Sequence, residues 1–199
     1  MLDPKPAVGW RIWRLRDGRL HSWVVDHVWE PGHNQARCLS VEPPALSTRY
    51  SCSQAPGPGC MCGFWALWDL KRCLVKGRAE ESSASGQAVI GLMQGWGTVA
   101  VHGQEGFRAQ HAKALFLIND SVWDAGLDPL VSGVWSVAWR RWLRLSSRRP
   151  LPSDEVQEAA DYYGVPRASL VDAVRRGLLA EHGVPRQQVE SADAVLRSR

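Results

Sequence analysis

The sequence predicts an α+β fold in which short antiparallel strands and two tryptophan-rich helices precede a small all-α C-terminal domain. Alternating segments around a turn dipeptide lie near the N-terminus, and two tryptophan-bearing segments have helical spacing. After residue 147 the tryptophans stop and three short helical patterns follow. A chain of 199 residues can form one domain of about 150 residues with a small appendage. We therefore place the domains at residues 1–147 and 148–199.

The first predicted element is a hairpin formed by residues 11–16 and 19–25. Asp17-Gly18 separates these segments, and this dipeptide readily adopts the positive φ angles of a type I′ turn. The period-two pattern places Trp10 and Trp13 on opposite faces, so both faces of the strand should be covered. Residues 36–41 predict a third short strand.

Residues 42–61 predict a long irregular loop. Four prolines exclude regular structure there, and three cysteines lie within the loop or at its end. Long loops inside compact domains are usually tied down or functional. We therefore expect the cysteines to matter for this loop.

The remainder of the first domain combines helices and strands. Residues 63–75 and 130–145 predict helices, because large apolar side chains recur there at helical spacing. Residues 88–96, 98–102 and 112–118 predict strands, the first two separated by Gly97. The composition also stands out, because eleven tryptophans accompany only three phenylalanines and three tyrosines. Such large amphipathic rings suit both a core and a binding surface.

The formal net charge of +4 and the isoelectric point near 9.0 give a mild preference for polyanionic partners. The basic residues are unevenly distributed, and five arginines fall close together: Arg140, Arg141, Arg144, Arg148 and Arg149. Two interpretations stay open, namely a solvated helix face with a linker, or a patch that contacts phosphates.

The N-terminal residues have no apolar segment typical of a secretory signal, and no window contains the roughly 18 consecutive apolar residues of a membrane helix. We therefore expect a cytoplasmic protein without a membrane partner. Its five cysteines are an odd number, which argues against a disulfide framework. Metal ligation or a reactive thiol becomes the more relevant chemistry.

The strongest local signal is a group of four cysteines near the middle of the chain: Cys38, Cys52, Cys60 and Cys62. Four thiolates can close a tetrahedral zinc site and so fasten the loop. The close Cys60-Met61-Cys62 spacing is unusual for such a site, and one of His21, His27, His33 or His102 can replace a thiol. Buried unligated cysteines are the alternative, and Cys73 is expected in the core.

A catalytic thiol is a further alternative. Cys62 directly precedes the predicted helix, whose dipole would lower the pKa of the thiol. With Gln54 upstream and His102 or His111 downstream, the order loosely resembles that of papain-like cysteine hydrolases. The Cys-Gly-Ser-Cys-Trp run of that family is absent. The sequence therefore favours no triad.

Two short segments, Cys60-x-Cys62-Gly63 and Gly106-Phe107-Arg108-Ala109, resemble a pattern of small uncharacterised actinobacterial and actinophage proteins. The resemblance extends over residues 38–118 at most. It implies no activity, and at most an actinobacterial or mobile-element origin.

The C-terminal segment resembles the helix-turn-helix of bacterial regulators. Residues 154–163, 168–179 and 185–196 predict three short helices, with Ala160 and Gly164 at the positions of the small residue and the turn. The residues that such a motif would turn toward DNA are Arg167, Ser169, Arg175 and Arg176. A helical packing module without DNA is the alternative.

These observations predict an accessory or regulatory binding protein that contacts DNA through its C-terminal helices and the preceding arginines. One rival is a protein interaction module that uses tryptophans as its surface. A second rival is a cysteine-dependent hydrolase. The sequence favours a protein that is not an enzyme, with zinc as its expected metal.

Overall fold

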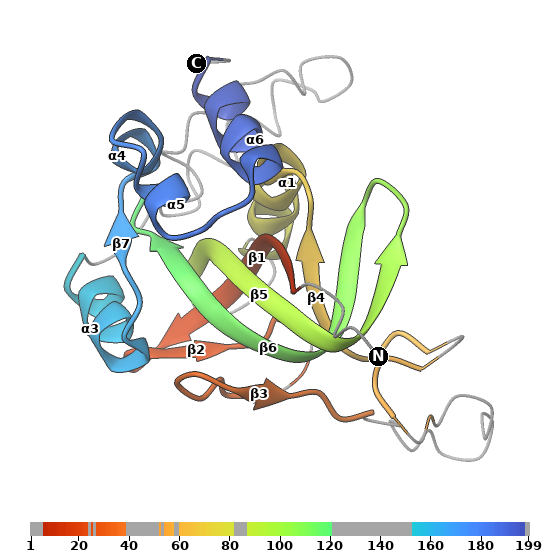
Figure 1. The fold of residues 1–199 in the computed structure, drawn as a ribbon. Coiled ribbons are helices and arrows are strands. Elements are labelled where there is room, and N and C mark those ends of the chain that lie inside the picture. Colours follow the sequence, from red (N-terminus) through yellow and green to blue (C-terminus); the bar gives the residue numbers. More distant parts are fainter. Residues whose placement is uncertain are drawn as a thin grey trace, which may run out of the picture.

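Seven strands form one mixed sheet at the centre of the molecule (Figure 1). The computed structural model describes residues 6–23, 25, 27–38, 52, 54–57, 60–81, 87–120 and 153–197. The strands are β1 (Ala7–Arg16), β2 (Arg19–His21), β3 (Asn34–Gln35), β4 (Phe64–Leu67), β5 (Gln87–His102), β6 (Gly106–Ile118) and β7 (Arg167–Ala168). All pairings are antiparallel except that of β6 with β7.

The pairings of four strands close a circuit. β5 pairs with β1 along one part of its length and with β6 along most of it, while β4 joins β6 to β1. The closure brings β1 and β4 very near each other at Gly9, where a Cβ atom would lie 2.9 Å from the Cβ of Ala66 and 2.9 Å from the ring of Phe107. A glycine is therefore required where the circuit closes.

The predicted N-terminal hairpin is confirmed. Asp17 and Gly18 have φ angles of 47° and 66°, and they connect β1 to β2. Trp10 and Trp13 are both fully buried and belong to different hydrophobic clusters, as the alternating pattern predicts. The third strand is shorter than predicted and precedes residue 36, because β3 consists only of Asn34–Gln35.

The helix predicted over residues 63–75 is wrong in its first half. Phe64–Leu67 is the strand β4, and the helix α1 extends over Leu70–Glu81. The N–H of Arg72 donates to the carboxylate of Asp69 at 2.8 Å, which caps the first turn. The aromatic run before Asp69 is thus a strand buried between two neighbours, whose apolar spacing also suits a helix.

The two strands predicted around Gly97 are one strand. β5 contains 16 residues, with irregularities in its register between Leu92 and Met93 and between Trp96 and Val99. Gly97 has a φ of 76° at the second irregularity, where the strand bends without ending. β6 begins six residues before the predicted start at residue 112.

The predicted fold class is wrong in its C-terminal part, because these residues do not form a small all-α domain. The helices α3 (Ser153–Tyr163), α4 (Leu170–Arg175), α5 (Leu178–Glu181) and α6 (Arg186–Arg197) share the core of the sheet, although an α+β description is compatible with the whole. β7 lies between α3 and α4 and extends the sheet beside β6. The predicted helix over residues 130–145 and the boundary at residues 147 and 148 lie outside the described residues.

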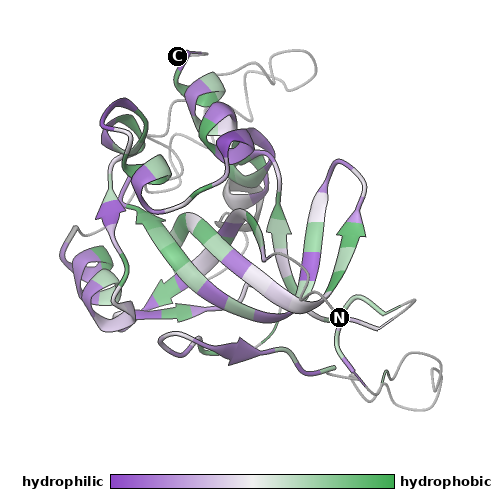
Figure 2. Cartoon of the chain, in the orientation of Figure 1, coloured by the Kyte–Doolittle hydropathy of each residue, from purple (hydrophilic) through white to green (hydrophobic). Residues whose placement is uncertain are grey.

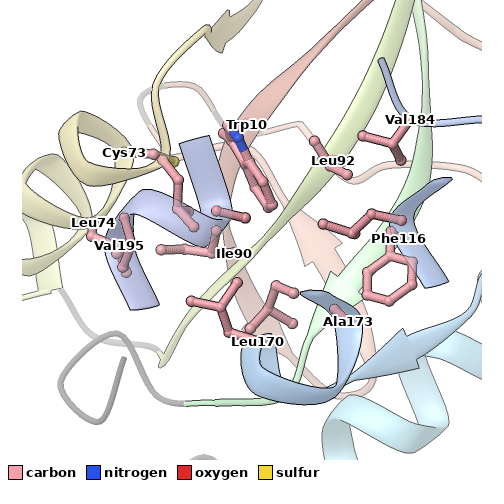
Figure 3. Packing of buried hydrophobic residues seen from close by; sticks show 14 of the residues in the cluster. Trp10, Cys73, Leu74, Ile90, Leu92, Phe116, Leu170, Ala173, Val184 and Val195 are labelled. Carbon is pink, nitrogen blue, oxygen red and sulfur yellow. The ribbon is translucent and has the colours of Figure 1, made fainter. Parts of the chain in front are cut away.

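Two clusters of buried side chains occupy the two sides of the sheet. The first contains Trp10 and Leu92 of the sheet together with Cys73 of α1, Leu170 of α4 and Val195 of α6 (Figure 3). The second contains the side chains of α3 that pack against Trp13 and Trp29. Apolar residues follow the strands while the helices alternate between apolar and polar positions, as Figure 2 shows. Helices from both parts of the sequence thus cover the sheet.

Two polar side chains, those of Tyr163 and Gln188, connect the C-terminal segment to the N-terminal part of the chain. The hydroxyl of Tyr163 accepts from the N–H of Leu20 at 3.0 Å and donates to the carbonyl of Trp29 at 2.7 Å. The amide of Gln188, which is 1% exposed, donates to the carbonyl of Val8 at 2.8 Å. Among the described residues, no helix is long and apolar enough to cross a membrane.

Candidate metal centre

Four cysteines from three separate parts of the sequence converge beside the start of β4. Cys38 follows β3, Cys52 precedes the segment 54–57, and Cys60 and Cys62 directly precede β4. Their four Sγ atoms all lie within 4.8 Å of one another. This group can hold a metal ion, as the sequence predicts, and the unusual spacing of Cys60 and Cys62 does not keep either sulfur out of the group.

The sulfur atoms form two closer pairs. Cys38 Sγ lies 3.5 Å from Cys60 Sγ, and Cys52 Sγ lies 3.2 Å from Cys62 Sγ. All four are free thiols and all are partly buried. Each pair joins one cysteine of the Cys60–Cys62 segment to a cysteine from an earlier part of the chain. The four sulfurs therefore surround a common centre.

Backbone amides point at three of the sulfurs. The N–H of Cys62 is the largest influence on Cys60, and with the neighbouring thiols it lowers the pKa of Cys60 to about 7. The N–H of Cys52 favours the thiolate of Cys38, although hydrogen bonds from neighbouring thiols and desolvation leave the pKa of Cys38 raised. Desolvation raises the pKa of Cys62 to about 12, against the effect of the N–H of Gly57.

These shifts differ in sign among three thiols that share one site. Cys60 is favoured as a thiolate, whereas desolvation and the neighbouring thiols oppose the ionisation of Cys38 and Cys62. A bound cation would remove that opposition, since it stabilises every neighbouring thiolate. The electrostatics of the group therefore suit metal ligation better than an isolated reactive thiol.

Two glycines shape the segment that carries the ligands. A Cβ atom on Gly57 would lie 2.7 Å from Cys52 Sγ, so any side chain there would displace this sulfur. Gly63 has a φ of 109° and turns the chain from Cys62 into β4. The indole N–H of Trp65 donates to the carbonyl of Met61 at 3.0 Å and supports the same turn.

Sequence reasoning missed Arg108, which lies directly behind the Cys60–Cys62 segment. Its guanidinium donates to the carbonyl of Cys60 and to the carbonyl of Cys62, the latter at 3.1 Å. The sequence analysis named Arg108 only as part of the Gly106-Phe107-Arg108-Ala109 segment. The signal was present, because Gly106-Phe107-Arg108-Ala109 and Cys60-x-Cys62-Gly63 are the two segments that carry the resemblance noted above.

The histidines named as alternative ligands all lie elsewhere. The Nε2 atom of His102 accepts from Arg108 Nε at 2.7 Å, and its ring stacks on Trp65 with centroids 4.7 Å apart. His33 contacts His111, with Nε2 and Nδ1 2.8 Å apart. His27 packs on the ring of Phe64, and burial lowers its pKa. Of the residues that the structure describes, only the four cysteines form a metal-ligating group of three or more.

The hypothesis of a catalytic thiol depended on Cys62 lying at the start of a helix, and the structure does not place it there. Cys62 precedes the strand β4, so it does not lie at a helix N-terminus, and α1 begins only at Leu70. His111 contacts His33, and the amide of Gln54 donates to the hydroxyl of Thr98 at 3.4 Å. Cys73 is fully buried in the first hydrophobic cluster, as expected of a core residue.

The described residues that were predicted to contact DNA lie on β7 and at the two ends of α4. Arg167 lies on β7, where its Nε donates to the amide oxygen of Gln157 at 2.6 Å. Ser169 caps α4 by accepting from the N–H of Asp172 at 3.1 Å. Arg175 and Arg176 are exposed at the end of α4. The remaining predicted contacts, at Arg140, Arg141, Arg144, Arg148 and Arg149, lie outside the described residues.

The arrangement of α3 and α4 differs from that of a helix-turn-helix. Ala160 of α3 is buried in the second hydrophobic cluster, whereas Leu170 of α4 is buried in the first. The two helices therefore pack on opposite sides of the sheet, with β7 between them.

In comparisons with known proteins, no family model, curated protein or solved structure matches this chain. The resemblance to actinobacterial proteins therefore stays a prediction.

Proposed function

We propose that this chain is a zinc-binding accessory protein whose metal centre is structural. The convergence of Cys38, Cys52, Cys60 and Cys62 within 4.8 Å of one another carries the proposal. A zinc ion bound to four sulfurs at about 2.3 Å gives a tetrahedron with sulfur–sulfur edges of about 3.8 Å. To fit the ion, the pairs at 3.5 and 3.2 Å would lengthen slightly, and any separation near the 4.8 Å limit would shorten.

The donor set favours zinc and a closed site. Thiolates are soft ligands that select zinc over magnesium or calcium, and four protein ligands complete a tetrahedron. A catalytic zinc usually keeps a position for water or substrate, which four cysteines would fill. The donor set is therefore that of a structural zinc site and not of a catalytic one.

The proposed metal would hold a segment that has little other means of folding. Cys52, Cys60 and Cys62 lie in or at the end of a segment rich in proline, serine and glycine, and Cys62 leads through Gly63 into β4. β4 pairs with both β6 and β1, so fixing its start also supports the closed circuit of strands. The free energy of metal binding thus becomes free energy of folding.

A protein is the first candidate for the binding partner of this chain. Met61, between two of the proposed ligands, is 73% exposed, and Val101 near the end of β5 is 64% exposed. Both side chains are apolar and exposed to solvent, Met61 between two proposed zinc ligands and Val101 on β5. Contiguous exposed apolar patches mark interaction sites, so Met61 and Val101 are the positions at which this proposal is to be tested by substitution.

DNA binding is the second candidate. The consecutive side chains of Arg175 and Arg176 are exposed at the end of α4, where they can contact phosphates. Arg167 and Ser169 already have partners within the chain, so they contribute less to this candidate. The two candidates differ in their response to salt, since phosphate contacts weaken steeply as salt rises.

The zinc proposal is tested by the metal content of the purified, untagged chain. Native mass spectrometry and elemental analysis should find one zinc per chain. Cys52→Ser should lose most of this zinc, whereas Cys73→Ala, which removes the buried thiol outside the group, should retain it. Zinc absent from the wild-type chain after reconstitution with zinc under reducing conditions would contradict the proposal.

A further inference from the structure

Arg108 is a buried cation that has no carboxylate partner among the residues the structure describes. The residue is 5% exposed, and its contacts with the described residues are hydrogen bonds and a ring contact. Placing an uncompensated charge in a buried position is costly unless a counter-charge or a full set of hydrogen bonds stabilises it. The surroundings of Arg108 therefore need an explanation.

The guanidinium contacts four groups around the start of β4. Its Nη1 donates to the carbonyls of Cys60 and Cys62, and its Nε donates to His102 Nε2 at 2.7 Å. Its Cζ lies 5.2 Å from the ring centroid of Trp65, the residue that pairs with Arg108 across β4 and β6. These contacts are to neutral groups or to a ring face, so none supplies a negative charge.

The group of four cysteines can supply negative charge beside Arg108, because its guanidinium binds the carbonyls of Cys60 and Cys62. A divalent ion bound to four thiolates carries a formal charge of −2, and two of the proposed ligands belong to the residues whose carbonyls Arg108 holds. We infer that Arg108 is the positioning residue and electrostatic complement of the metal centre, an inference that rests on the proposed zinc site.

Arg108 also fixes the backbone conformation of the segment that carries Cys60 and Cys62. One nitrogen of a rigid guanidinium binds two carbonyls separated by a single residue, so the Cys60-Met61-Cys62 backbone is bent around it. Both cysteine side chains can then reach the same ion despite their close spacing. The stacked pair of Trp65 and His102 holds the other edge of the guanidinium in place.

Arg108 thereby connects the metal centre to the projecting turn between β5 and β6. His102 is the last residue of β5, and Arg108 follows the start of β6 by two residues. Such residues around metal ligands orient the ligands and adjust the affinity, and their loss typically costs 10- to 100-fold in metal affinity. The same range is expected here.

The test compares zinc affinities measured by competition with a chromophoric chelator. Arg108→Met should bind zinc about 10- to 100-fold more weakly than the wild type. Arg108→Lys should fall between the two, since it keeps the charge but loses the planar fork. The matched controls are Arg14→Met and Arg14→Lys. Arg14 lies on β1, and its Cζ lies 5.0 Å from the ring centroid of Trp23, so it contacts an aromatic ring as Arg108 does but does not contact the Cys60–Cys62 segment. Both controls should keep the wild-type affinity.

Cobalt substitution adds a readout that a general loss of stability would not change. In the wild type, Co²⁺ should show the thiolate charge-transfer and d–d bands of a tetrahedral four-sulfur site, and Arg108→Met should shift or weaken them. The Arg14 variants should show wild-type bands. If Arg108→Met does not fold, Arg108→Lys compared with Arg14→Lys decides the question.

The possible failures are distinguishable. Wild-type affinity in the Arg108 variants, or an equal loss in the Arg14 variants, would overturn the role of Arg108 and leave the zinc proposal intact. A wild-type chain that binds neither zinc nor cobalt would overturn the zinc proposal itself.

Discussion

Tyr163→Phe should destabilise the whole sheet, although the residue lies 134 positions from Trp29 in the sequence. The Tyr163 hydroxyl is the partner of two buried backbone groups, the N–H of Leu20 at 3.0 Å and the carbonyl of Trp29 at 2.7 Å. Removing the hydroxyl leaves both groups without this partner while the ring still packs. At about 1–3 kcal/mol for each of the two unsatisfied groups, we expect a loss of about 2–6 kcal/mol in the free energy of unfolding.

The assay is urea denaturation followed by tryptophan fluorescence and circular dichroism. The fluorescence reports on the sheet, because Trp13 and Trp29 are fully buried beside the side chains of α3. Tyr162→Phe is the matched control, since Tyr162 is 37% exposed and its ring contact with Arg19 would persist. The control should change stability by less than about 0.5 kcal/mol. An equally small effect of Tyr163→Phe would refute the packing of α3 described above.

Three further predictions concern the metal centre and the second candidate partner. Gly57→Ala should weaken zinc binding, because the added Cβ would lie 2.7 Å from Cys52 Sγ; unchanged affinity in chelator competition would contradict this geometry. Zinc binding should release about one more proton at pH 6 than at pH 8, measured by calorimetry in buffers of different ionisation enthalpy, because Cys60 has a pKa of about 7. If DNA is a partner, Arg175→Ala with Arg176→Ala should reduce the salt slope of binding by about two; an unchanged slope would remove these contacts.

The sign of the pH effect follows from the direction of the shift. The pKa of Cys60 is lowered from 9.0 to about 7 in the folded chain, so folding favours its thiolate. The stability that this contributes is present above pH 9 and is lost as the pH falls through 7. Zinc affinity should therefore fall more steeply below pH 7, where Cys60 must also lose a proton to bind. A pH-independent proton count would contradict a ligand role for Cys60.

Local signals predicted the parts of the fold that local chemistry determines. Asp17-Gly18 marks a turn because few other dipeptides accept two positive φ angles, and the turn is present. The apolar spacing around Phe64 and Trp65 suits a helix and a buried strand equally well. Pairing with β6 and β1 decides for the strand, and those partners are distant in the sequence.

The C-terminal misassignment has a similar cause. Arg167 and Ala168 carry no strand signal of their own, yet they pair in parallel with Leu117 and Ile118. This two-residue strand directs α3 and α4 to opposite sides of the sheet, so a segment that reads as a helical motif is part of the main core. Sequence patterns within the segment could not show a partner 50 residues away.

The cysteine group was predictable as a set of residues but not as a geometry. Four thiols near a proline-rich loop indicate a metal, whereas only the fold shows that the loop ends meet β4 so that all four sulfurs converge. Arg108 was missed for the same reason. Its importance comes from lying opposite Trp65 on the neighbouring strand, and a lone arginine in a sequence does not reveal its neighbours.

The four-sulfur zinc site can be tested by X-ray absorption at the zinc edge, on the intact chain loaded with one equivalent of zinc. We expect a single shell of four sulfur atoms at about 2.3 Å, as ligation by Cys38, Cys52, Cys60 and Cys62 requires. A shell with fewer than four sulfurs, or one completed by nitrogen or oxygen at about 2.0 Å, would contradict it.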